Sequence, residues 1–137
     1  MSTTSLRTAG VLLVVFPTVV FGGASLLWHW ITARTAYYDH PVRRDLWRAG
    51  HAHAGVLLIL SLVALSLVDQ ANLGDGWKQV VRTSFPAAAL LLPAAYFLSI
   101  VRPDAERPNR LVNLAYVGAV ALTLGMITLG VGLIRAT

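Results

Sequence analysis

The chain has 137 residues, of which 56% are hydrophobic and only 12% charged, with a mean hydropathy of +0.66. Soluble domains usually carry roughly 25% charged residues, so the composition excludes an ordinary soluble protein and predicts a single all-α membrane domain over residues 1–137. The absence of cysteine excludes disulfides, Cys-ligated zinc and iron–sulfur clusters. The net charge of +5 comes from basic residues that flank apolar runs, which indicates a lipid bilayer as the partner and no nucleic acid.

Four apolar segments are candidates to cross a hydrocarbon core about 30 Å thick, which requires about 20 residues of α-helix. They cover residues 9–31, 52–68 (extending to about 73), 85–101 and 111–134. Arg7 before the first segment is compatible with a signal peptide, but the run is long and has no clean small-x-small cleavage site. We therefore expect a retained first helix and an integral membrane bundle of four transmembrane helices.

The first segment contains Pro17, which predicts a kink, and ends in Trp28-His29-Trp30. A histidine near the membrane core is a candidate functional residue, because it is costly unless its polar atoms are satisfied. Flanking tryptophans also fit an aromatic belt at the membrane interface. Both interpretations of His29 stay open. In the long connection that follows, His40 is interpreted as a polar loop residue, and Pro41 as the start of a short interfacial helix.

The second segment opens with two histidines, His51 and His53. The first helix ends where the second begins, and helices joined by one loop are usually neighbours, so His29, His51 and His53 are expected at one membrane face. Imidazole is a common ligand for zinc, copper and iron. One histidine from each of two helices is also a suitable pair of axial ligands for haem b. The sequence therefore predicts these three histidines as metal or haem ligands.

Helical geometry limits how these histidines act together. Residues two apart on an α-helix point about 200° apart, so either the helix begins after His51, or His51 and His53 do different jobs. His51 and Gly55 are four apart and share a face. A small residue one turn below a histidine leaves room for a flat ring, so Gly55 is predicted to contribute to cofactor binding.

The third and fourth segments carry proline and glycine patterns. Pro86 is expected in the first turn of the third helix, where proline is tolerated. Gly118, Gly125 and Gly132 are spaced by seven and share one face of the fourth helix. Such a stripe predicts close helix packing, with a flat cofactor lying against it as the alternative.

Two polar residues begin the fourth segment at the same membrane face as the histidines. These are Asn113 and Tyr116. A polar group beside a ligand histidine orients its imidazole, so we expect Asn113 and Tyr116 to support cofactor binding. Taken singly, each is also compatible with a simple interfacial anchor.

Charge predicts the orientation. Seven arginines lie in the first and third connections, and four basic residues lie on the other side. The positive-inside rule places the first and third connections in the cytoplasm and both termini outside, here across a bacterial-type plasma membrane.

The stretch Arg48-Ala-Gly-His51-Ala-His53-Ala-Gly-Val-Leu-Leu resembles small four-helix membrane proteins related to subunit I of haem–copper oxidases. In that group a His-x-His element opens the second helix, and the resemblance implies haem or copper near His51 and His53. It covers residues 48–58 and the number of helices. No histidine follows position 53, so the chain lacks the later ligands of a complete oxygen-reducing centre.

The predicted function is that of a membrane protein that binds haem b or a copper or zinc ion, in electron transfer, sensing or cofactor handling. One alternative is a non-catalytic accessory subunit, with the glycine face of the fourth helix against a partner in a larger membrane complex. Another is a small homo-oligomeric transporter or lipid-binding protein. Whether the chain is an enzyme stays open.

Overall fold

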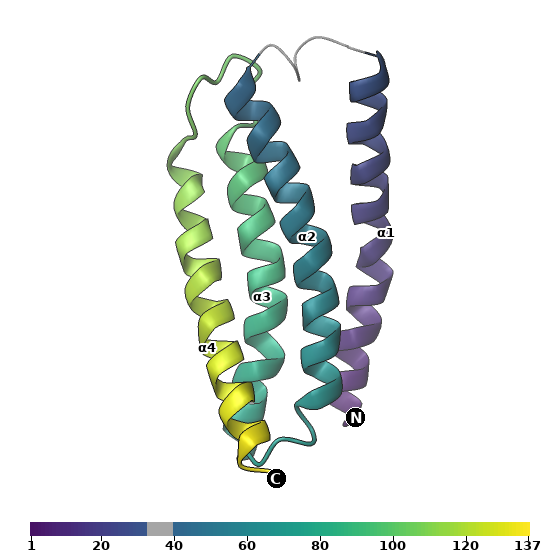
Figure 1. Ribbon diagram of the computed structural model, residues 1–137, viewed down its shortest axis with the longest axis vertical. Helices are drawn as coiled ribbons and strands as arrows, with labels where there is room; N and C mark the ends of the chain where they lie inside the picture. The colour runs from purple at the N-terminus through teal and green to yellow at the C-terminus, as the bar shows by residue number, and fades with distance from the viewer. Residues whose placement is uncertain (33–39) are drawn as a thin grey trace.

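The computed structural model describes residues 1–32 and 40–137, and they form an all-helical bundle (Figure 1). The elements are α1 (Thr3–Thr32), α2 (Pro41–Leu67), α3 (Asp75–Ser99), the short 3-10 helix η2 (Arg110–Asn113) and α4 (Leu114–Ile134). All four α-helices are long and apolar enough to cross a membrane. The prediction of an all-α protein with four such helices is confirmed.

The helices α1, α2 and α3 begin earlier than the apolar segments predicted. Pro41 is the first residue of α2, so the expected interfacial helix and the second apolar segment form one continuous helix. Asp75 lies in the first turn of α3, where a carboxylate stabilises the positive end of the helix dipole. Pro86 consequently lies inside α3 and not in its first turn. Residues 33–39 of the predicted first connection, including Arg34, lie outside the described residues.

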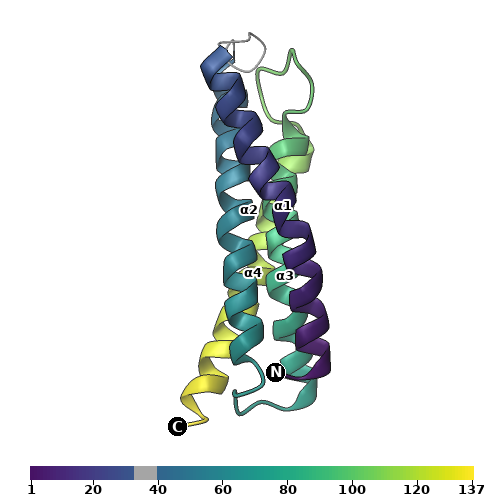
Figure 2. The same cartoon turned by 90° about the vertical axis from the view of Figure 1, so that its right-hand side faces the viewer.

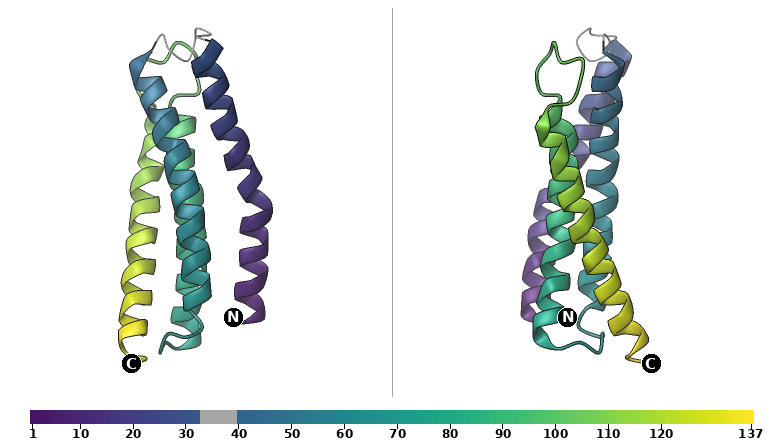
Figure 3. Two further views of the ribbon diagram at one scale, coloured as in Figure 1. Left: turned by 45° about the vertical axis from the view of Figure 1, so that its right-hand side comes forward. Right: turned by 90° about the vertical axis from the view of Figure 1, so that its left-hand side faces the viewer.

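The chain runs up and down, so that both termini and the turn between α2 and α3 lie at one end (Figure 1). In the described part of the chain, α3 packs along both α2 and α4, whereas α1 contacts mainly α2. Figures 2 and 3 show α1 at the edge of the bundle, crossing α2. Only Ser5 and Leu12 of α1 are fully buried. The helix α1 is therefore the most loosely packed of the four.

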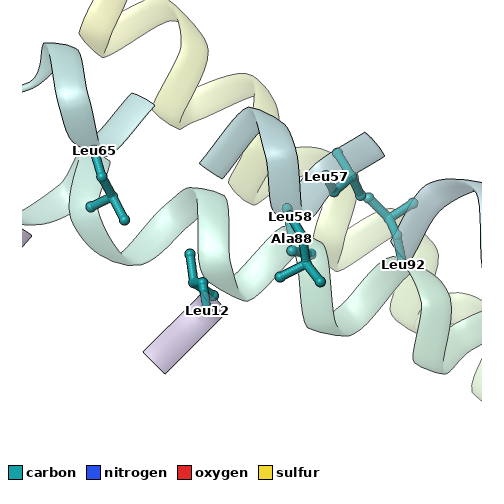
Figure 4. Close-up of a cluster of buried hydrophobic side chains, with 7 residues drawn as sticks. Leu12, Leu57, Leu58, Leu65, Ala88 and Leu92 are labelled. Atoms are coloured by element: carbon teal, nitrogen blue, oxygen red, sulfur yellow. The ribbon is translucent and has the colours of Figure 1, made fainter. Parts of the chain in front are cut away.

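The hydrophobic core is shared by α1, α2 and α3 (Figure 4). Its buried members are Leu12, Leu57, Leu58, Leu65, Ala88, Ala89 and Leu92. A second cluster lies towards the turn between α2 and α3 and joins these helices to α4 through Phe85 and Leu129. Leu12 is thus the residue by which the middle of α1 joins the core.

The glycine stripe of α4 packs within the chain. Gly118, Gly125 and Gly132 are all buried. A Cβ atom on Gly125 would lie 3.0 Å from the Phe85 ring, and one on Gly132 would lie 2.5 Å from Leu73 Cγ. The prediction of close helix packing is confirmed. The alternative, a flat cofactor against this stripe, is wrong because α3 and the turn before it fill the space.

Replacing Gly125 with leucine is expected to destabilise the bundle by about 1–3 kcal/mol, because the larger side chain must displace Phe85 or Ser84. Gly130 on the same helix supplies the control, since no heavy atom lies within 4 Å of the Cβ that leucine would add. Thermal unfolding in mild detergent measures both variants. Equal melting temperatures for the two would contradict this packing.

Candidate functional site

The His51 ring lies against the backbone of α1. A Cβ atom on Gly23 would lie 3.0 Å from His51 Nε2, and one on Gly22 would lie 3.5 Å from His51 Nδ1. The first distance is shorter than ordinary van der Waals contact, so a larger residue at Gly23 would push the imidazole away. The Gly22–Gly23 pair therefore makes the space in which the imidazole of α2 meets α1.

Next to this contact, a chamber of about 530 Å³ opens between α1, α2 and α3. It is lined by Leu12, Val15, Thr18, Val19, Gly22, His51, Ala54, Leu58, Pro86, Ala89, Leu90, Pro93, Ala94 and Phe97. His51 is the one titratable side chain among these described lining residues, and the Thr18 hydroxyl donates to the Val15 carbonyl of its own helix. Cavities that bind small molecules are usually about 300–1,000 Å³ and mostly apolar. The chamber has the size and composition of such a site.

His53 has different surroundings from His51. Its Nδ1 lies 2.7 Å from the Ala49 carbonyl oxygen, and its ring centroid lies 5.1 Å from that of Tyr96. Because a carbonyl only accepts, Nδ1 is the donor in this contact. Both histidines lie within α2, so the structure favours the alternative in which they do different jobs. His53 does not line the chamber.

The third predicted ligand, His29, lies in the last turn of α1. Its ring packs edge-on against Trp28, with a centroid distance of 5.1 Å and an interplanar angle of 70°. His29 does not line the chamber. Across residues 1–32 and 40–137, no group of three or more His, Cys, Asp or Glu side chains is placed to hold a metal ion. The structure therefore brings His51 to the chamber without gathering the three predicted histidines into one cluster.

The predicted supporting residues also lie away from the chamber lining. Tyr116 is 73% exposed, and Asn113 is an exposed residue at the end of η2. Gly55 does face α1, as its spacing from His51 predicts, but a Cβ there would meet Val19 at an ordinary 3.7 Å. The close approach to the imidazole is made by Gly22 and Gly23 of α1, which the sequence analysis did not identify as site residues.

Arg43, in the first turn of α2, is a buried cation on the same helix as His51. The residue is 7% exposed, and its Cζ lies 4.9 Å from the centroid of the Trp47 ring. In the sequence, Arg43 counts only towards the positive charge between the first two apolar segments. Its burial was not visible in the residue pattern, because arginine is usually exposed.

A polar cluster fixes the opposite end of α1. Arg82 Nη2 donates to Asp69 Oδ1 at 2.6 Å, the Ser2 backbone N–H donates to Oδ2 at 2.6 Å, and Arg82 Nε donates to Ser5 Oγ at 3.1 Å. Desolvation raises the pKa of Asp69, but the hydrogen bonds from Ser2, Arg82 and Ser5 outweigh it and hold the pKa below its usual range. Asp69 thus ties the start of α1 to α3.

Comparisons of the chain with protein-family models, with curated proteins and with solved structures find no match.

Proposed function

We propose that this chain is an integral membrane protein that binds haem in the chamber between α1, α2 and α3, with His51 as its axial ligand. The observation that carries the proposal is a single imidazole on the wall of an apolar chamber of about 530 Å³. Bound haem would supply an iron centre for electron transfer or for binding a small gas. The chain would supply the imidazole and the apolar walls.

The lining residues fit a flat, lipophilic ring. Gly22, Ala54, Ala89 and Ala94 present little or no side chain to the chamber. The contact with Gly22 and Gly23 places the His51 ring at the chamber wall, where Gly22 is also a lining residue. These features favour haem over a bare copper or zinc ion, which would need several ligands close together.

The chamber supports cofactor handling or sensing better than electron transfer through two histidines. Among the described residues, His51 is the one imidazole in the lining, and His53 lies against Tyr96 instead. With His51 as the one protein ligand, bound haem would keep a coordination position for a small ligand or for an acceptor of the cofactor. The accessory-subunit alternative loses its original support, because the glycine face of α4 already packs within the chain.

The proposed arrangement in the membrane follows the arginine bias. Seven arginines lie between the first and second apolar segments and between the third and fourth. This bias favours a cytoplasmic location for the start of α2 and for the loop after α3, with both termini outside. The first and last turns of the chamber helices would then lie on opposite sides of a bacterial-type plasma membrane. A homo-oligomer or a larger complex is compatible with this arrangement.

Haem titration of the purified protein tests the proposal. The wild type is expected to give a saturable Soret band, and His51→Ala is expected to weaken binding by roughly 100-fold or more, since even outer-shell partners of a ligand are worth 10–100-fold. His40→Ala is the matched control, because His40 caps α2 outside the chamber and should leave binding unchanged. A wild type that binds no haem, or a His51→Ala variant that binds normally, would overturn the proposal. Parallel copper and zinc titrations test the ion alternatives.

A further inference from the structure

Arg43 is a buried cation whose hydrogen-bonding capacity is not met within the described part of the chain. The residue is 7% exposed, and its Nε and Nη1 atoms are buried without a hydrogen-bond partner there. Burying a charge without a partner is costly, and buried polar groups in folded proteins nearly always have one. The Trp47 ring beneath the guanidinium offers a cation–π contact but accepts no in-plane N–H. The Arg43 Nε and Nη1 groups therefore favour an anionic ligand, because an anion accepts hydrogen bonds from both.

The local electrostatics also favour an anion. The first turn of α2 contains no acidic residue, and the N-cap residue His40 makes no side-chain hydrogen bond to the free backbone N–H groups. The start of a helix carries a partial positive charge. Asp45, the next acid along the helix, is exposed and lies 3.5 Å from Arg44. The positive charge around Arg43 is thus not neutralised by the described acids of its own helix.

The position of Arg43 relates it to the chamber. Residues 43, 47, 50 and 54 follow the spacing of one helix face. A Cβ on Gly50 would lie 3.0 Å from the Phe97 ring, and both Phe97 and Ala54 line the chamber. The guanidinium lies over Trp47, one turn further along this face. Arg43 therefore lies nearer the start of α2 than the chamber does, beyond the end where Phe97 lines it. About 16 Å of helix separates Arg43 from Ala54.

We infer that Arg43 binds the acidic group of an amphiphile whose apolar body occupies the chamber. The inference rests on the proposed function for the chamber itself, and it adds the chemical class of the ligand: an apolar, flat or elongated body with a carboxylate or phosphate at one end. The guanidinium fork matches either anion in a bidentate geometry. A cofactor carboxylate and a lipid phosphate share this chemistry.

The first arm of the test compares haem with haem dimethyl ester, which lacks the two carboxylates. Each is titrated into the protein in nanodiscs of phosphatidylcholine. The wild type is expected to bind haem roughly 10-fold or more tightly than the ester, the size expected for hydrogen bonds to a charged group. Arg43→Gln is expected to lose this preference and to keep its affinity for the ester. Arg48→Gln is the matched control, because Arg48 is an exposed arginine of the same helix.

The second arm identifies a lipid source. Phosphatidylglycerol is added to the nanodiscs, and the rise in melting temperature is compared between wild type and Arg43→Gln. A rise that depends on Arg43 assigns the anion to a lipid phosphate, and the melting temperature without ligand reports whether the variant folds. Equal responses of wild type and Arg43→Gln to haem, ester and phosphatidylglycerol would overturn the inference. If the wild type binds haem and the ester with equal affinity, only the carboxylate as the source of the anion is overturned. If it binds neither, the proposed function is overturned, and the phosphatidylglycerol comparison alone tests whether Arg43 binds an anion.

Discussion

Replacing Gly23 with leucine is expected to weaken haem binding by at least roughly 10-fold, while the four helices stay folded. A Cβ at this position would lie 3.0 Å from His51 Nε2 and 3.1 Å from His51 Cε1, so the longer side chain occupies the place of the imidazole. Displacing the ring removes it from its ligating position, and misplacement of a first ligand costs at least as much as loss of an outer-shell partner. The fold should tolerate the change because α1 is the least buried helix.

Gly10 provides the control for Gly23, since no heavy atom lies within 4 Å of the Cβ that leucine would add there. Gly10→Leu adds the same apolar side chain to the same helix. Haem affinity measures the site in both variants, and far-ultraviolet circular dichroism measures their helix content. If Gly23→Leu bound haem like Gly10→Leu, the close contact between α1 and His51 would have no part in binding.

Asp69→Asn is expected to lower the free energy of unfolding by about 3 kcal/mol. The substitution leaves the Arg82 guanidinium, whose side chain is 11% exposed, without its carboxylate, and breaking a largely buried ion pair by removing one partner is strongly destabilising. It also weakens the contact of Ser2 with the same carboxylate, so the start of α1 should loosen. Asp75→Asn is the control, because Asp75 is exposed in the first turn of α3 and contributes at most about 1 kcal/mol through the helix dipole.

The same carboxylate predicts an acid-sensitive step in stability. Desolvation raises the pKa of Asp69, but the hydrogen bonds from Ser2, Arg82 and Ser5 lower it further, so the folded pKa lies below the unfolded value of about 3.9. The stabilisation is therefore fully present above the unfolded pKa and is lost as pH falls below it towards the folded pKa. Melting temperatures of the wild type and Asp69→Asn should converge as the pH is lowered below about 3.9. A gap that stays constant as the pH is lowered well below about 3.9 would contradict this role of Asp69.

The sequence was sufficient for the number and apolar character of the helices, because long hydrophobic runs require no tertiary information. It was less accurate for the start of α2 and α3. Arg43, Arg44 and Asp45 are polar enough to interrupt a hydropathy window, yet they continue α2 from its proline start. Hydropathy detects the part of a helix that prefers lipid, whereas backbone hydrogen bonding decides where the helix begins.

The site was predictable only where it depended on the period of one helix. Residues two apart on an α-helix lie on nearly opposite faces, and His51 and His53 do have different surroundings. The partner of His51 depends on the register between α1 and α2, which no pattern within either helix specifies. The sequence therefore did not indicate Gly22 and Gly23, and it predicted that Gly55 makes the space beside the His51 ring that these two glycines provide.

Two residues at the same depth in the membrane do not necessarily lie close together. Tyr116 was expected near the histidines because it lies at the same end of the bundle, but it is 73% exposed and does not line the chamber. Residues at one depth are spread around the whole circumference of a four-helix bundle. Only helix order and rotation decide which of them meet, and these come from packing between helices.

The most direct test of the central claim, that His51 is the axial ligand of a haem in the chamber, is chemical rescue of His51→Gly. Glycine removes the imidazole and leaves a space of its shape beside Gly22 and Gly23. We predict that His51→Gly loses the haem spectrum of the wild type and that added imidazole restores it, while N-methylacetamide, which cannot ligate iron through a ring nitrogen, does not. A His51→Gly variant whose haem spectrum matches that of the wild type without imidazole would contradict the claim.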